Sequence, residues 1–268
     1  MELISLKILI GFIVGTLIGL TGLGGGVLLL PLLIFVLHVP AIMAVGSDAV
    51  FNFITKIGSS VVHLRKGTVR RKVVIALAIG SAPGSILGVS LLAHLRNVYG
   101  AGVNDFIKVA VGILLICIPT LLLFQRRIED RLVGQPPTAK SFAGMAVIGL
   151  VAGFLVGMTS VGSGSIIMML LLLFYSYKPQ IMVGTDIVHA VILTGVTSLL
   201  HYRLGNVNPG LVGWLIVGSI PGGIAGSYLS TRVPVLWLRR ILCTVLLGTG
   251  ARMLWSAPFV GQLLRQHF

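Results

Sequence analysis

Long apolar stretches alternate with short polar ones along almost the whole chain. Their lengths are close to the roughly 20 residues that a helix needs to cross the hydrocarbon core of a membrane. The stretches lie at about 3–38, 41–63, 73–93, 104–124, 142–177, 180–201, 208–230 and 235–256. The pattern predicts an all-α fold, a polytopic bundle of transmembrane helices.

The first and fifth stretches are too long for one crossing. An unbroken helix over 3–38 would measure about 50 Å, whereas the hydrocarbon core is about 30 Å thick. Each stretch contains a glycine-rich motif, GLTGLGGG at 19–26 and GMTSVGSG at 157–164. Glycine lets the backbone leave helical geometry, and small hydroxyl groups satisfy the freed backbone groups. Each stretch is therefore predicted to form a broken or re-entrant helical hairpin.

The two motifs belong to an internal duplication with an offset of 138 residues, since Thr159 matches Thr21 (159 − 21 = 138). The same offset maps 46–48 (Gly-Ser-Asp) onto 184–186 (Gly-Thr-Asp) without a gap. It also maps His63, Arg65, Gly67, Val69, Gly80, Ser81, Pro83, Gly84 and Gly88 onto identical residues. We therefore predict two homologous transmembrane repeats, 1–124 and 142–268, joined by a polar linker over 125–141.

Composition and charge support this class. Hydrophobic residues make up 56% of the 268 residues and charged residues only 10%, too few to coat a water-soluble enzyme or to sustain disorder. Although 20 Lys and Arg face 6 Asp and Glu, the cations lie in short clusters between apolar stretches. Such clusters are typical of cytoplasmic loops under the positive-inside rule, so we expect no nucleic-acid partner.

Matched loops of the two repeats carry opposite charge bias. Residues 65–72 hold five cations, whereas the matching stretch of the second repeat holds only Arg203. Conversely, 232–240 holds three arginines where the first repeat has Arg96 and Lys108. The bias favours inverted repeats, with 65–72, the linker and 232–240 on the cytoplasmic side.

Asp48 and Asp186 occupy the same position in each repeat, near the start of an apolar stretch. One interpretation is a helix N-cap at the membrane surface. The other is that both acids lie deeper, where ionisable residues are expensive and usually mark a pathway.

A polar stripe follows each acid at helical spacing. In the first repeat it comprises Asp48, Asn52, Thr55, Lys56, Ser59 and His63, and in the second Asp186, His189, Thr194, Thr197 and His201. Such a stripe must face protein or water. Hydrogen bonding between helices would account for the Ser and Thr residues but not for Lys56.

Lys56 is the most informative single residue. A cation about two turns inside a span costs a few kcal/mol unless it is paired, so it should meet Asp48, Asp186 or an anionic ligand. Snorkelling to the interface is the alternative. A histidine at the depth of His189 could carry a proton.

The glycine-rich motifs suggest a second source of positive potential. If each loop starts a half-helix inside the membrane, its free N–H groups point at the cavity and form an anion site. The candidate residues are Thr21, Gly22, Gly24, Gly25, Gly26, Thr159, Ser160, Gly162, Ser163 and Gly164. Close helix packing is the other use of such glycines.

The sequence shows no nucleotide-binding loop, haem motif or metalloprotease motif, and Cys117 and Cys243 lack metal or redox spacing. We expect no cofactor and no metal. Transport would then require an ion or substrate gradient.

The sequence resembles the sulfite exporter TauE/SafE family of bacterial membrane permeases. The resemblance rests on GLTGLGGGVLLLP at 19–31, the Gly-Ser/Thr-Asp triplets, Thr55-Lys56, His63, His201, 67–69 (Gly-Thr-Val), 205–207 (Gly-Asn-Val) and 218–221 (Gly-Ser-Ile-Pro). It implies a multi-pass inner-membrane permease that moves small sulfur-containing anions, sulfite or organosulfonates, usually outward. Ala190 and Thr194 stand where the first repeat has Asn52 and Lys56, which makes an asymmetric site expected.

The leading hypothesis is a secondary transporter with alternating access to a midplane anion site. Lys56, Asn52, Thr194 and the glycine-rich motifs would bind substrate, while Asp48, Asp186 and His189 would serve in coupling or gating. The expected partners are a small anion, the lipid bilayer and, as one option, a second copy in a homodimer. A passive anion channel and a transporter of another organic anion are the alternatives, and an intramembrane enzyme is disfavoured.

Overall fold

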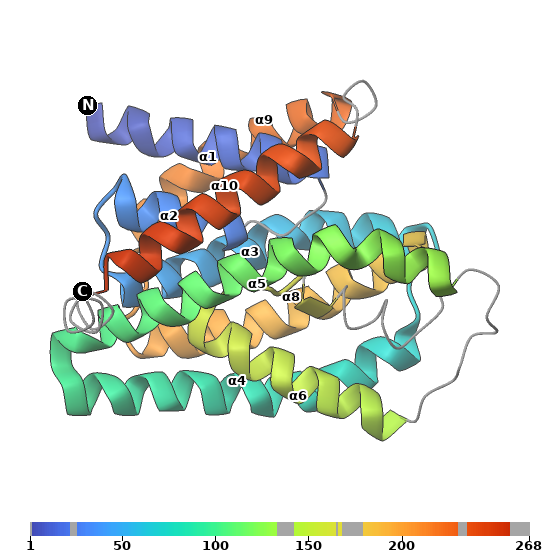
Figure 1. Ribbon diagram of the computed structural model, residues 1–268, viewed down its shortest axis with the longest axis horizontal. Helices are drawn as coiled ribbons and strands as arrows, with labels where there is room; N and C mark the ends of the chain where they lie inside the picture. Colours follow the sequence, from blue (N-terminus) through green and yellow to red (C-terminus); the bar gives the residue numbers. More distant parts are fainter. Residues whose placement is uncertain are drawn as a thin grey trace.

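The computed structural model describes residues 2–21, 26–132, 142–164, 166–167, 179–229 and 235–257, and these ranges contain helices and no strand (Figure 1). The helices are α1 (Glu2–Thr21), α2 (Gly26–Phe35), α3 (Ala41–Arg65), α4 (Arg71–Tyr99), α5 (Val103–Leu132), α6 (Phe142–Thr159), α8 (Pro179–Arg203), α9 (Pro209–Leu229) and α10 (Val235–Trp255). A short 3-10 turn, η1 (Gly100–Gly102), joins α4 to α5. The predicted all-α class is confirmed.

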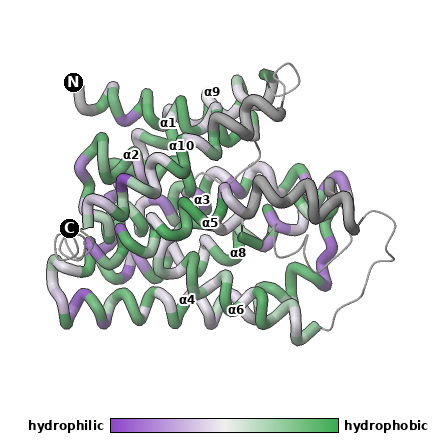
Figure 2. The backbone as a smooth tube through the Cα atoms, in the orientation of Figure 1, coloured by the Kyte–Doolittle hydropathy of each residue, from purple (hydrophilic) through white to green (hydrophobic). Residues whose placement is uncertain are grey.

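Five helical stretches of the described chain are long and apolar enough to cross a membrane. They are Ala41–Arg65, Arg71–Thr120, Phe142–Thr159, Ile181–Arg203 and Pro209–Gly226. Shorter apolar helices lie at Ile4–Ile18, Gly26–Phe35 and Leu242–Trp255. Hydrophobic residues dominate most of the length of these helices (Figure 2). The chain is therefore a multi-pass membrane protein by length and composition.

The structure describes part of each glycine-rich motif in the two overlong apolar stretches. In the first, α1 ends at Thr21 and α2 begins at Gly26. In the second, α6 ends at Thr159 and a turn covers 160–164, with φ of 56° at Ser160 and 94° at Gly162. A left-handed φ ends helical geometry, and glycine is the residue that adopts it without strain.

The helices pair between the repeats in a matched way. Helix α1 packs on α9 and α4 packs on α6, and these two pairs lie at opposite edges of the bundle, with α3, α5 and α8 between them (Figure 1). Helix α3 packs on α8, and α5 on α10. Because the offset of 138 relates α1 to α6 and α9 to α4, each edge pair is the counterpart of the other.

Glycines carry the edge contacts, and these contacts obey the same offset. A Cβ added at Gly11 would overlap the carbonyl of Leu215, and one added at Gly149 would overlap the carbonyl of Leu77. The pairs continue with Gly15 on Ser219, Gly222 on Phe12, Gly153 on Ser81 and Gly84 on Leu150. The numbers rise together along both partners, so the helices of each edge pair run parallel. Backbone lies against backbone there, as in other membrane helix interfaces rich in small residues.

Hydrogen bonds at the two ends of α3 and α8 also match. The Asn208 N–H donates to Ser47 Oγ at 3.1 Å, and the Arg70 N–H donates to Thr185 Oγ1 at 3.0 Å. The beginning of α3 therefore lies beside the beginning of α9, and the beginning of α8 lies beside that of α4. Since α3 leads directly into α4 and α8 into α9, the helices α3 and α8 run antiparallel.

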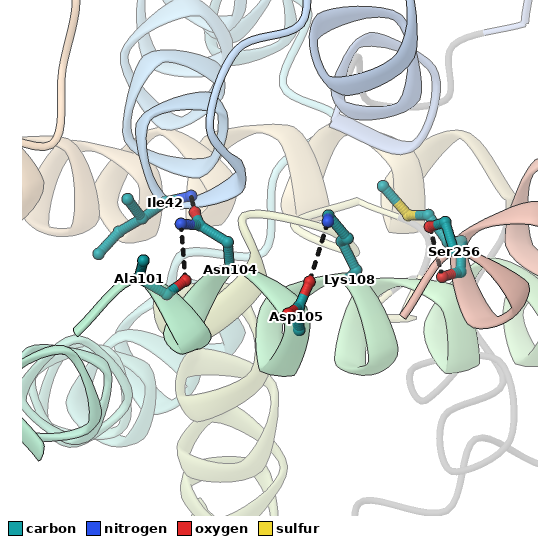
Figure 3. Close-up of polar contacts among 7 residues, drawn as sticks. Ile42, Ala101, Asn104, Asp105, Lys108 and Ser256 are labelled. Atoms are coloured by element: carbon teal, nitrogen blue, oxygen red, sulfur yellow. Dashed lines mark hydrogen bonds and ion pairs between the residues drawn. The ribbon is translucent and has the colours of Figure 1, made fainter. Parts of the chain in front are cut away.

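The first turn of α5 is tied to the beginning of α3 (Figure 3). Asn104 Oδ1 accepts a hydrogen bond from the Ile42 N–H at 3.1 Å, and Asn104 Nδ2 donates to the Ala101 carbonyl at 3.0 Å. One turn on, Lys108 Nζ pairs with Asp105 Oδ1 at 3.0 Å. The two Asn104 contacts join the α4–α5 turn to the end of the bundle where α3 starts.

The polar linker predicted over 125–141 starts as a helix, because α5 continues to Leu132. The rest of that stretch lies outside the described residues. The repeat boundaries stay a prediction.

Candidate functional site

The polar stripe of α3 lies inside the bundle. Asp48, Asn52, Lys56 and Ser60 are buried at a constant spacing of four residues, whereas Ser59 is exposed. Asp48 lies two turns inside α3, which starts at Ala41, so it is not the N-cap of this helix. Both acids are buried in the bundle, and their place on a transport pathway stays a prediction.

Asp48 lies where the glycine-rich motifs of both repeats meet. Its Oδ2 accepts hydrogen bonds from Ser160 Oγ at 2.7 Å and from Asn52 Nδ2 at 2.9 Å. The Asn52 amide also donates to the Asp48 carbonyl at 3.0 Å. A Cβ at Gly26 would fall 2.7 Å from Asp48 Oδ2 and 2.8 Å from the Ser160 carbonyl, so only glycine fits there. A negative charge near the start of α2 is favourable because the helix dipole is positive at that end.

Lys56 reaches the glycine-rich motif of the second repeat. Its Nζ donates to Ser163 Oγ at 2.8 Å and to the Ser163 carbonyl at 3.3 Å, and the residue is only 9% exposed. The ammonium thus ends inside the bundle and not at the end of α3. It interacts electrostatically with Asp186 and Asp48, neither of which lies within 4.0 Å. The cation has two acidic neighbours but no contact ion pair with either.

The facing side of α8 is polar and buried. Asp186, His189, Thr194, Thr197 and His201 are at most 6% exposed. His189 Nε2 hydrogen-bonds Ser81 Oγ at 2.7 Å, and Thr197 Oγ1 hydrogen-bonds Ser85 Oγ at 2.9 Å. Sequence reasoning missed Ser81 and Ser85 as members of the site. Their spacing of four residues, beside Gly80 and Gly84, is the signal that could have placed them on the packed face of α4.

Four buried side-chain atoms have no hydrogen-bond partner among the described residues: Asp48 Oδ1, Asn52 Oδ1, Asp186 Oδ1 and His189 Nδ1. Buried polar atoms are normally satisfied, so each orphan requires an explanation such as a bound ion, water or ligand. All four lie on the stripes of α3 and α8. These two helices pack on each other.

The other candidate residues are distributed as follows. Gly22, Gly24 and Gly25 lie outside the described residues, and of Thr21 only its place at the end of α1 is described. Thr159 Oγ1 and Thr194 Oγ1 each donate to the carbonyl four residues earlier, at 2.6 Å. Gly162 and Gly164 belong to the turn that carries Ser163. In the described part of the chain no group of three or more His, Cys, Asp or Glu could hold a metal ion.

A chain of hydrogen bonds connects the site to one end of the bundle. His201 Nε2 bonds the Gly157 carbonyl at 3.0 Å, and His201 Nδ1 lies 3.4 Å from the Asn206 amide. Asn206 Oδ1 in turn accepts from the Arg96 guanidinium at 2.7 Å. The α8–α9 loop is thereby joined to the end of α6, next to the glycine-rich turn.

Known proteins match this chain along almost its whole length. The family described as "Sulfite exporter TauE/SafE" matches residues 7–253. The probable membrane transporter protein YjnA of Bacillus subtilis (strain 168) is 38% identical over 251 residues, covering 92% of this chain and 98% of the relative. A second protein of that strain, the probable membrane transporter protein YunE, is 26% identical over 274 residues, covering 94% and 97%.

A probable membrane transporter protein of Xylella fastidiosa (strain Temecula1) is 26% identical over 252 residues, covering 92% of this chain and 93% of the relative. No solved structure gives a significant match to this chain. The family match spans both repeats and includes both glycine-rich motifs and both polar stripes. The chain belongs to the sulfite exporter TauE/SafE family of membrane transporters.

Proposed function

We propose that the protein exports small sulfur-containing anions, sulfite or an organosulfonate, by gradient-driven alternating access across the bacterial inner membrane. The observation that carries the proposal is the buried ammonium of Lys56, held on Ser163 beside the glycine-rich turn of the second repeat. An intramembrane cation without a contact ion pair favours an anionic ligand. The family description points to the same class of substrate.

The site is asymmetric in a way that suits one anion. Thr194 matches Lys56 in the second repeat, and Ala190 matches Asn52. The first repeat therefore supplies the cation, while the second supplies the loop hydroxyl of Ser163 that holds it. One ammonium between two repeats that are similar but not identical gives a small oxyanion a single binding site near the centre of the bundle.

Depth in the bundle supports a central position. Phe53 of α3 packs against Gly195 of α8, which places Lys56 close to the crossing of these antiparallel helices. Asp48 lies about 12 Å along α3 from Lys56, at about 1.5 Å per residue. Asp186 lies toward the opposite end of the bundle, because α8 runs the other way. We assign both acids and His189 to coupling or gating on the two sides of the anion.

Inverted repeats would make alternating access natural. The hydrogen bonds of Ser47 and Thr185 favour this arrangement, because they put the start of α3 and the start of α8 at opposite ends of the bundle. The parallel edge pairs support it equally: α1 starts with α9, and α6 starts with α4. The charge bias of the loops then assigns 65–72 and 232–240 to the cytoplasmic side.

The test is sulfite accumulation in proteoliposomes that hold the purified protein, with pH gradient and membrane potential set independently. We expect uphill accumulation by the wild type and its loss in Lys56→Met. Lys108→Met, which removes a cation of the α5 surface, is the matched control and should transport normally. Lys56→Arg should keep part of the activity because it keeps the charge.

Sulfite flux that never accumulates sulfite against its concentration gradient would mean that the protein is a passive anion channel and not a coupled transporter. Normal accumulation by Lys56→Met would contradict the role of the cation. If sulfite is not moved, a panel of organosulfonates and carboxylates identifies the class of anion.

A further inference from the structure

The orphan oxygens of Asp48 and Asn52 form a feature that an anion site does not use. Both residues are fully buried, at 0% exposure. Asp48 Oδ2 has two donors, but Asp48 Oδ1 and Asn52 Oδ1 have none among the described residues. The Asn52 amide orientation is fixed, since its Nδ2 donates to two Asp48 oxygens at 2.9 and 3.0 Å. Two buried acceptors on adjacent turns of α3 thus have no donor among the described residues.

The end of α6 contributes a further oxygen atom close to Asp48. Helix α6 ends at Thr159, and the carbonyl of Ser160 lies beside Asp48 Oδ2 at the Gly26 backbone. The end of a helix carries negative partial charge from its free carbonyls. Broken membrane helices use such unwound carbonyls to coordinate small cations.

Charge balance points the same way. Among the described buried residues, Asp48 and Asp186 supply two carboxyl groups and Lys56 one amine. A bound anion adds negative charge to this interior, which is unfavourable away from water. A monovalent cation at Asp48 offsets that charge, and a single carboxylate is too little charge for a divalent ion.

We propose that Asp48 and Asn52, with the Ser160 carbonyl, form a sodium site that supplies the coupling ion of the transporter. The inference deepens the proposed function and rests on it for the bound anion in the charge argument and for the role of sodium as coupling ion. Oxygen atoms from three residues suit sodium, whereas a proton needs one carboxylate oxygen. The second repeat has Ala190 in place of Asn52, so the matching position at Asp186 lacks the amide ligand.

The experiment measures the thermal unfolding of the purified full chain in detergent, without any substrate anion. Sodium chloride is compared with potassium chloride and choline chloride at equal ionic strength. We expect a saturable rise in Tm of about 3 °C or more with sodium alone. In Asn52→Ala, the sodium concentration for half of the effect should rise about tenfold or more.

Asn97→Ala is the matched control, because it removes an exposed asparagine near the end of α4, and it should keep the sodium response. Binding of radioactive sodium to the wild type gives a second readout if Asn52→Ala does not fold. Equal stabilisation by all three salts, an unchanged response in Asn52→Ala, or stabilisation that follows only pH would overturn the sodium site. Absence of sulfite transport would leave this result intact, so the two proposals fail separately.

Discussion

The packing of α6 against α4 makes a quantitative prediction at Gly157. An added Cβ there would lie 2.6 Å from the Ser85 carbonyl oxygen and 3.0 Å from Ser85 Cα. Ordinary contacts of a Cβ begin at 3.4 Å, so the backbones would have to separate by about 0.8 Å (3.4 − 2.6). Backbone cannot rotate away as a side chain can. Ser85 also hydrogen-bonds Thr197 of α8, so the displacement would reach the facing helix.

We therefore expect Gly157→Ala to destabilise the protein by about 1–3 kcal/mol, the range for overpacked interiors. For a chain of this size the corresponding fall in Tm is roughly 2–10 °C. The assay is thermal unfolding in detergent. Gly58→Ala is the control, because an added Cβ at Gly58 has no neighbour within 4 Å, and this variant should match or exceed the wild type. A Gly157→Ala protein that melts with the wild type would refute the tight α4–α6 interface.

Three further outcomes are expected. Gly15→Ala and Gly153→Ala should lower Tm by similar amounts, because each new methyl overlaps the carbonyl of a matched serine, and a large difference would contradict the equivalence of the two edges. Ser163→Ala should weaken sulfite binding less than Lys56→Met does, because it leaves the ammonium in place. Titration calorimetry measures both affinities, and an equal loss would mean that the hydroxyl, and not the charge, binds the anion. Arg96→Met should increase the labelling of single cysteines placed in the α8–α9 loop, because the guanidinium no longer holds Asn206 of that loop. Unchanged labelling would show that this contact does not hold the loop.

Hydropathy anticipated the helices well because burial in lipid constrains every position of a span. The stretch expected at 41–63 is α3, Ala41–Arg65, and the one expected at 180–201 is α8, Pro179–Arg203. The end of α6 at Thr159 lies in the second glycine-rich motif, where glycine and length together predicted a break. Residues 22–25 of the first motif lie outside the described residues, so the hairpins stay a prediction. The end of α5 was not anticipated, because the polar residues after 124 continue the helix to Leu132.

The side-chain contacts within the site could not be predicted from the sequence. Lys56 was expected to meet an acid or an anion, and its contact is Ser163, a residue more than a hundred positions away that two helix pairs bring to α3. The predicted stripe included Ser59, which the structure exposes, and left out Ser60. The structure buries Ser60, because a strict spacing of four keeps the same face of α3 toward α8.

The repeat pattern was the strongest guide beyond hydropathy. The offset of 138 residues that relates the two halves of the sequence also relates contacts in the structure. Gly11 lies against Leu215, and its counterpart Gly149 lies against Leu77, the counterpart of Leu215. Several candidate site residues lie at positions where the two repeats carry different residues. In the second repeat, Ala190 stands in place of Asn52 and Thr194 in place of Lys56. In the first repeat, Phe51 stands in place of His189.

The central claim is that Lys56 supplies the positive charge for a bound anion. The most direct measurement is the equilibrium dissociation constant of sulfite for the purified wild type and for Lys56→Met, with Tm recorded for both. We expect Lys56→Met to bind at least about tenfold more weakly, because a charged hydrogen-bonding contact is lost, while the protein stays folded. Equal affinity in the two folded proteins would contradict the claim.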